Sequence, residues 1–178
     1  MARQNKEIVA SDSESKFYFQ EMFFSKTDLV GNILTGNEVF VRVSQYSKEE
    51  LIGSPHNIIR HPDMPRIVFK VMWERIQSGK DILALVKNLA KDGRYYWVFT
   101  TFEPDRDLDS GEIFGYKAFR KAAPKDVVEI IEALYKELLE AEKEGGMEAS
   151  FAHLQAFLHA KDPSLEFQDI MENIHKFY

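Results

Sequence analysis

The sequence predicts an α+β fold built on an antiparallel sheet of five strands. Three observations predict it. Two short strand patterns come first, short helical patterns follow, and three further strand patterns then stand together, separated only by turns. Strands joined by hairpins pair in antiparallel fashion without helical crossovers, so this order favours an α+β plan. Amphipathic helical periodicity takes over only after Pro124, which predicts a C-terminal helical extension.

Length and composition fit one domain with an extension. The chain has 178 residues, of which 44% are hydrophobic and 13% aromatic, and this content is sufficient for a packed core. We divide the chain into a lead-in over residues 1–20, a domain over residues 21–122 and the helical extension over residues 123–178.

Charge and residue types exclude several classes of protein. Residues 1–120 hold 17 basic and 17 acidic side chains, so the net charge of −6 arises after residue 120, and no basic patch for nucleic acid is present. The chain has no cysteine, which excludes disulfides, thiolate metal sites and covalent thiol–cofactor adducts. No apolar run approaches the ~18 residues of a membrane span and no signal peptide is present, so we expect a soluble, cytoplasmic protein.

The first elements are assigned from strand composition and helix caps. The aromatic run over residues 17–24 predicts a strand, and residues 33–35 predict a second short strand after a turn. Asn37 is suited to cap the helical turn that follows. Ser47 and Glu50 have the spacing of a capping box, which predicts another short helix behind them.

A stiff turn and a longer helix come next. Residues 60–64 read RHPDM, and their prolines disfavour helical backbone, so we expect an irregular turn. The helix is predicted from Pro65 to Ser78, with Asp63 or Met64 as its cap. An arginine, a histidine and a carboxylate held beside a helix N-terminus either bind an anion or neutralise one another, and the residues alone leave both interpretations open.

Three strands and three helices complete the chain. Strands are predicted over residues 82–89, 95–102 and 113–119, the first two joined by the hairpin turn KDGR. The first helix of the extension is predicted to end at Gly145-Gly146, and Ser164 is predicted to cap the third. These helices need an apolar partner surface, either on the domain or on another chain.

Several motifs resemble those of a known family. The run GNEVFVRVSQYSKEELIGSPHNIIRHPDMP, with VKNLAKDGRYYWV and GEIFGYKAFR, resembles the PAS domain of the Aer and CetB-like flavin-binding energy-taxis sensors. The resemblance covers about residues 21–120 and implies the PAS fold, a five-stranded antiparallel sheet with short helices on one face. The element RHPDMP is its narrowest motif. Leu89-Ala90, Lys117-Ala118 and Ile82 depart from the family pattern.

The resemblance also implies a cofactor and its contacts. In this family the matching positions bind FAD or are required for FAD binding, and they fall on a set spread over the domain: Asn37, Arg60, His61, Asp63, Trp73 and Asn88. Phe69 shares a helical face with Trp73 and is placed with them. A flavin ring needs aromatic walls and a few donors at its polar edge. By spacing alone, Trp73 would be core packing, Asn88 a locally bonded strand residue and His61 a structural hydrogen bonder.

The leading hypothesis is a sensor that binds FAD non-covalently and reports redox or energy state, linked to oxygen, to a partner such as a membrane chemoreceptor-type signalling protein. One alternative is a haem-binding gas sensor with His56 or His61 as the axial ligand. Another is a ligand-free PAS module for protein interaction or homodimerisation. We do not expect an enzyme, because no nucleophile–base pair, phosphate-binding glycine loop or metal-ligand spacing is evident.

Overall fold

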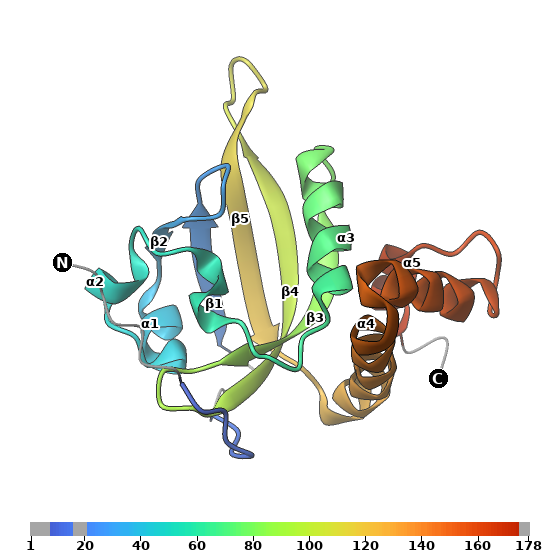
Figure 1. Cartoon of the computed structure of the whole chain (residues 1–178). Coiled ribbons are helices and arrows are strands. Elements are labelled where there is room, and N and C mark those ends of the chain that lie inside the picture. The colour runs from blue at the N-terminus through green and yellow to red at the C-terminus, as the bar shows by residue number, and fades with distance from the viewer. Residues whose placement is uncertain (1–7, 16–20, 175–178) are drawn as a thin grey trace.

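The predicted five-stranded antiparallel α+β architecture is confirmed by a computed structural model that describes residues 8–15 and 21–174 (Figure 1). The strand order is β2-β1-β5-β4-β3. The strands are β1 (Met22–Thr27), β2 (Ile33–Gly36), β3 (Ile82–Leu89), β4 (Tyr95–Arg106) and β5 (Ile113–Ala122).

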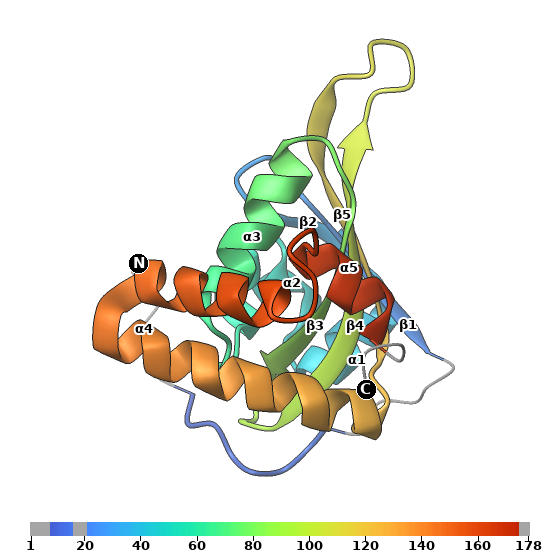
Figure 2. The ribbon, with the colours of Figure 1, turned by 90° about the vertical axis from the view of Figure 1, so that its right-hand side faces the viewer.

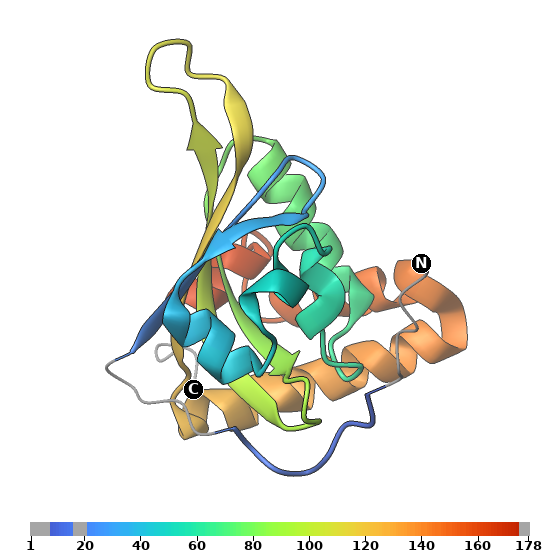
Figure 3. The ribbon, with the colours of Figure 1, turned by 90° about the vertical axis from the view of Figure 1, so that its left-hand side faces the viewer.

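Helices stand between the second and third strands and again after the last strand. Those of the first group are α1 (Glu38–Ser44), α2 (Lys48–Leu51), the 3-10 helix η1 (His56–Ile59) and α3 (Arg66–Gln77). The C-terminal helices are α4 (Lys125–His159) and α5 (Phe167–Glu172). Figure 3 shows α1, α2 and α3 on one side of the sheet, where they bury its inner face.

Local capping rules account for the short helices. Asn37 caps α1, because its Oδ1 accepts a hydrogen bond from the amide of Phe40 over 3.1 Å. Ser47 and Glu50 form the predicted capping box of α2, with both reciprocal hydrogen bonds present. These two sequence predictions are confirmed.

The predicted cap of α3 is wrong. The helix begins at Arg66 with Pro65 in the N-cap position, and neither Asp63 nor Met64 caps it. The Asp63 carboxylate instead accepts a hydrogen bond from Lys87 Nζ over 2.8 Å. The amide of Arg66 donates a hydrogen bond to Glu142 of α4 over 2.8 Å. The cap of α3 therefore comes from an element that is distant in the sequence.

Strands β2, β4 and β5 extend beyond the ends that the sequence predicts, and the first strand is shifted along the chain. The aromatic run assigned to the first strand lies partly in residues 17–20, outside the described residues, while β1 itself continues to Thr27 by pairing with β5. Residues 103–106 after Phe102 are part of β4, because they pair with β5. Asp105 also forms ion pairs with Lys26 at 2.8 Å and Lys117 at 3.3 Å. The β4–β5 hairpin therefore projects beyond the rest of the sheet (Figure 1).

The C-terminal extension packs against the domain. Gly145 and Gly146 leave helical backbone geometry, so α4 consists of two helical segments that fold back on each other (Figure 2). This agrees with the predicted break at the two glycines. Apolar side chains of both segments and of α5 join the core cluster of the sheet, among them Val127, Ile131, Leu138, Leu154 and Ile170.

The predicted cap of the last helix is wrong. Ser164 does not cap α5, because its amide and hydroxyl both donate to Asp162. The N-cap of α5 is Glu166, which forms a capping box with Asp169.

Side chains from elsewhere also cover the open edge of β3. The Leu83 amide donates to Gln168 Oε1 over 2.8 Å, and the Leu85 carbonyl accepts from the Tyr135 hydroxyl over 2.7 Å. The Lys87 amide donates to the sulfur of Met64 over 3.2 Å. An uncovered edge strand invites pairing with other chains, so the extension completes the domain. Within the described ranges, no helix is long and apolar enough to cross a membrane.

Candidate functional site

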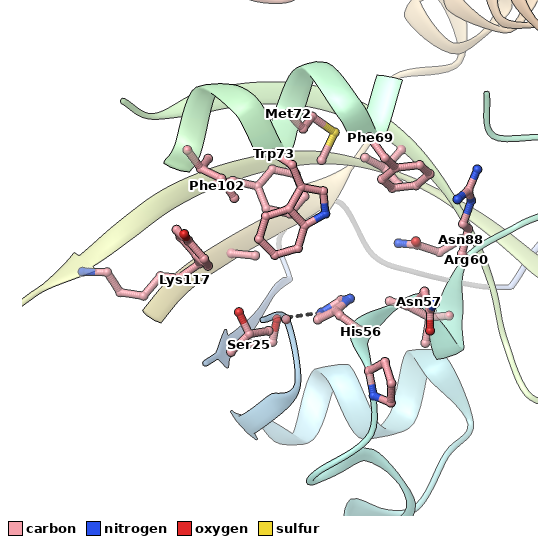
Figure 4. A pocket seen from close by; sticks show the side chains of 18 of the residues that line it. Ser25, His56, Asn57, Arg60, Phe69, Met72, Trp73, Asn88, Phe102 and Lys117 are labelled. Atoms are coloured by element: carbon pink, nitrogen blue, oxygen red, sulfur yellow. Dashed lines mark hydrogen bonds between the residues drawn. The ribbon is translucent and has the colours of Figure 1, made fainter. Parts of the chain in front are cut away.

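A cavity of about 410 Å³ lies between the inner face of the sheet and the helices η1 and α3. This volume falls in the range of small-molecule sites, about 300–1,000 Å³. Figure 4 shows side chains converging on the cavity from α3, from η1 and from the strands. The lining residues are Ser25, Thr27, Val30, Gly31, Pro55, His56, Asn57, Ile59, Arg60, Phe69, Met72, Trp73, Ile76, Val86, Asn88, Phe102, Tyr116, Lys117, Ala118 and Arg120.

Helix α3 supplies an apolar and aromatic wall. Phe69, Met72, Trp73 and Ile76 all line the cavity, as expected for one helical face. The Trp73 ring meets Tyr116 edge-to-face with the ring centroids 5.4 Å apart. Gly31 makes room for it, since a Cβ at this position would lie 3.1 Å from the indole. Tyr116 and Gly31 therefore fix the position of the Trp73 indole in the cavity wall.

A buried cation lies at another part of the wall. Arg120 is 2% exposed, and its guanidinium carbon lies 4.9 Å from the ring centroid of Phe23 and 5.7 Å from that of Phe102. It donates to Ser25 Oγ over 2.8 Å and to His56 Nε2 over 3.0 Å. Among the residues that the structure describes, no carboxylate forms an ion pair with Arg120.

The protonation states in this cluster follow from burial. Burial, together with the charge of Arg120, lowers the pKa of His56 to about 3. Burial also lowers the pKa of Arg120 to about 10, which leaves the guanidinium charged at neutral pH. Since an arginine can only donate, Nε2 of His56 is the acceptor and Nδ1 carries the proton. The cavity wall thus presents a permanent cation beside a neutral imidazole.

Asn88 places an unpartnered amide at the cavity. It lies on β3, lines the cavity and is 4% exposed. Its Nδ2 has no hydrogen-bond partner among the described residues. A buried polar group without a partner costs about 1–3 kcal/mol. The cavity therefore offers a hydrogen bond to whatever occupies it.

Arg60 extends from the proline turn to the same cavity. Its Nη2 donates to the carbonyl of Met64 over 3.0 Å, and its guanidinium carbon lies 4.4 Å from the centroid of the Phe69 ring. A short β-bridge joins the backbone of Arg60 to Asn88. Burial lowers the pKa of Arg60. In Figure 4 the two side chains lie close together at one end of the cavity.

The structure brings four of the seven predicted site residues to the cavity: Arg60, Phe69, Trp73 and Asn88. Asn37 lies elsewhere, where its Oδ1 accepts from the amide of Phe24 over 3.2 Å and its Nδ2 donates to the Met22 carbonyl. It therefore ties α1 to β1.

His61 and Asp63 do not line the cavity either. Nδ1 of the buried His61 accepts from the Asp63 amide over 3.1 Å, and the ring meets Tyr95 edge-to-face. Burial and then Lys87 lower the pKa of His61. Burial alone would raise the pKa of Asp63, but the hydrogen bond and charge of Lys87 lower it overall. These two side chains stabilise the turn that carries Arg60.

Sequence reasoning missed Arg120 and gave His56 a place only in the haem alternative. The signal for Arg120 was present in the period of two along β5, where Tyr116, Ala118 and Arg120 share the inner face. The described residues contain no group of three or more His, Cys, Asp or Glu side chains that could hold a metal ion.

Comparison with known proteins identifies the fold around this cavity. The family model described as the PAS fold matches residues 33–119. The aerotaxis receptor of Escherichia coli K12 is 41% identical over 114 residues, which cover 64% of this chain and 22% of the receptor. The biofilm dispersion protein BdlA of Pseudomonas aeruginosa is 30% identical over 78 residues, 43% of this chain and 19% of that protein. The matched part is thus about a fifth of each relative's length.

Solved structures agree on the fold. The light-state structure of the Aureochrome1 LOV domain gives a TM-score of 0.54 at 23% identity and covers 60% of this chain and 85% of that chain. A second light-oxygen-voltage domain, studied with a flavin analogue, gives a TM-score of 0.55 at 18% identity and covers 70% and 88%.

Proposed function

Because this chain contains a PAS domain similar to that of the aerotaxis receptor, we propose that it is a sensor that binds a flavin non-covalently and reports its redox state to a signalling partner. The observation that carries the proposal is the unpartnered Asn88 amide, buried at the wall of a cavity that also carries the aromatic side chains of Phe69 and Trp73.

The residues around the cavity fit a flavin. Trp73 and Phe69 offer flat apolar surfaces for a ring system, and Asn88 offers both a donor and an acceptor to its polar edge. Arg120 offers a buried positive charge without a carboxylate partner among the described residues. An uncompensated buried cation favours a ligand that is electron-rich or becomes negative.

We propose FAD as the flavin, on the ground of Arg60. The guanidinium stands at the cavity in a stiff turn and forms no ion pair among the described residues, so it can accept an anionic group such as a pyrophosphate. His61 and Asp63 would then act by stabilising this turn, and Asn37 by fixing α1 against β1.

A bound flavin supplies redox chemistry, since its ring gains electrons and a proton on reduction. Asn88 can turn its amide to donate or accept as the ring edge changes. The guanidinium of Arg120 stabilises added negative charge, and the neutral His56 keeps that guanidinium oriented through its Nε2. These responses require no catalytic residue, and we propose that the chain is a sensor and not an enzyme.

The partner belongs to the proposal as well. The relative with 41% identity is named a receptor for aerotaxis, and this chain spans about a fifth of it. By analogy with the name of that receptor, we propose that the signal passes to a partner protein, such as a membrane chemoreceptor-type signalling protein.

The haem alternative has less support. His61 does not line the cavity, and Nε2 of His56 already interacts with Arg120 and Ser25 at 3.0 Å each. An axial ligand would have to leave both partners and bind iron beside a guanidinium cation.

The absorption spectrum of the purified chain tests the proposal, with chromatographic identification of the cofactor released on denaturation. We expect twin bands in the blue and near ultraviolet and released FAD. A single intense Soret band would support the haem alternative instead. A colourless protein that stays so after FAD is added would support a ligand-free interaction module.

A further inference from the structure

One face of helix α4 contacts both walls of the cavity. Glu132, Tyr135 and Glu142 are spaced by three and seven residues, which places them along one side of the helix. Glu142 contacts α3, which carries Phe69 and Trp73. Glu132 and Tyr135 contact β3, which carries Asn88. The helix thus bridges the two elements that hold the proposed ligand contacts.

The contact with α3 is a helix cap. Glu142 Oε2 accepts from the Arg66 amide over 2.8 Å, and its Oε1 accepts from Arg66 Nε over 2.7 Å. The Glu142 side chain is 8% exposed, whereas that of Arg66 is 61% exposed, so the carboxylate is buried and the guanidinium faces solvent. No residue of the preceding turn caps α3, which makes Glu142 the carboxylate at its positive end. The cap fixes the first turn of the helix, one turn before Phe69.

The contact with β3 is made through a buried lysine. Lys87 Nζ lies 3.5 Å from Glu132 Oε1 and 2.8 Å from Asp63 Oδ2. It also lies 4.8 Å from the Tyr95 ring centroid and 5.7 Å from that of Trp97. Its neighbours in the strand, Val86 and Asn88, both line the cavity. The carbonyl of Leu85, the residue before Val86, accepts a hydrogen bond from the Tyr135 hydroxyl.

We propose that Glu142 and Glu132 are positioning residues for the cavity, and that docking of α4 and ligand binding favour each other. This inference rests on the proposed function. By holding α3 and β3 at their ligand-binding separation, α4 lowers the cost of ordering the cavity walls. Coupling between two sites is reciprocal, so a ligand in the cavity also stabilises the docked α4. Loss of the ligand loosens α4 and frees the extension for a partner.

The test measures FAD affinity in the full chain for matched glutamate variants. Glu142→Ala removes the α3 cap, and we expect it to weaken FAD binding about fivefold or more. Glu142→Gln keeps an acceptor for the Arg66 amide and should recover most of that loss. Glu140→Ala is the control, because Glu140 lies on the same helix and pairs with the exposed Lys143, both side chains being over 60% exposed. It should bind FAD like the wild type.

Amide hydrogen exchange provides a second measurement. If Glu142 only stabilised the fold, FAD would not change the exchange rates of α4. Saturating FAD should slow amide exchange in residues 125–144 of the wild type, and this protection should shrink in Glu142→Ala. If Glu142→Ala does not fold, Glu132→Gln and the wild-type exchange carry the test. Equal affinity of the Glu142 and Glu140 variants, or unchanged α4 exchange on FAD saturation, would overturn the inference. A wild type that binds no FAD would instead overturn the proposed function.

Discussion

The guanidinium of Arg120 donates to Nε2 of His56 over 3.0 Å, at the wall of a cavity lined by aromatic side chains. The interaction joins the last strand of the sheet to the 3-10 helix before the proline turn. Burial, together with the charge of Arg120, keeps the imidazole neutral, and the hydrogen bond orients the guanidinium. Much of the electrostatic character of the cavity follows from this pair.

Removing the buried cation should make a bound flavin harder to reduce. Arg120→Met replaces a guanidinium that lies among phenyl rings, so the fold should tolerate it. Without the charge, we expect the midpoint potential of the flavin to fall by about 30 mV or more, which for two electrons is about 1.4 kcal/mol. A spectroelectrochemical titration measures this. Lys117→Met, which also changes a cation lining the cavity, is the control, and an unchanged or higher potential in Arg120→Met would contradict the account.

Removing the Trp73 ring should release the flavin and spare the fold. Trp73 is only half-buried and faces the cavity, so Trp73→Ala should weaken flavin binding about tenfold or more and leave the circular dichroism spectrum unchanged. Trp97→Ala provides the contrast. Trp97 is 6% exposed and packs against Tyr135, so its loss should lower stability by about 3–5 kcal/mol. Unfolding of Trp73→Ala would show that Trp73 is core packing instead.

Stability should depend on His56 below neutral pH. The folded protein keeps His56 neutral down to about pH 3, whereas in the unfolded chain the histidine binds a proton below about pH 6.5. The unfolded state therefore binds more protons in this window, and the contribution to stability, complete above pH 6.5, is lost as the pH falls. The slope is at most about 1.4 kcal/mol per pH unit.

Urea unfolding between pH 4.5 and 7 measures this dependence as the difference between wild type and His56→Asn. The difference cancels the titration of carboxylates common to both proteins. A slope equal in wild type and His56→Asn would mean that His56 is accessible to protons in the folded state.

The buried Asn88 amide should lower the stability of the flavin-free protein and contribute to flavin binding. The amide is buried without a partner in the described structure, so Asn88→Leu, which has a similar shape, should raise the stability of the flavin-free protein by about 1 kcal/mol. The same change should abolish flavin binding, because the polar edge of the ring loses its partner. Chemical denaturation and flavin titration measure the two effects. A destabilised variant that still binds flavin would contradict both expectations.

Local rules predicted the parts of the fold that depend on nearby residues. The caps at Asn37 and Ser47, the apolar face of α3 and the break at Gly145-Gly146 all follow from short spacings. The Glu142 cap of α3 could not be predicted in this way, because donor and acceptor are 76 residues apart. Asp63 or Met64 was predicted as that cap, but the Asp63 carboxylate accepts a hydrogen bond from Lys87 instead.

The same distinction applies to the site. The four predicted residues at the cavity come from α3, β3 and the proline turn, where a narrow motif and helical periodicity were available. Arg120 and Ser25 meet across 95 residues of sequence, and their contact depends on the register between β1 and β5. The period of two along β5 places Arg120 on the inner face, but no local pattern specifies that register, so its contact with Ser25 was found only in the structure.

The proposed contact between Asn88 and the flavin is tested by observing the Asn88 side-chain amide itself. In the chain labelled with ¹⁵N-asparagine, titration with FAD is followed by NMR, with Asn88→Asp used to assign the signal. Asn173, which does not line the cavity, serves as the internal reference. We expect the Asn88 amide resonances to shift as the site fills and the Asn173 resonances to stay in place. Bound FAD with an unmoved Asn88 signal would contradict the account.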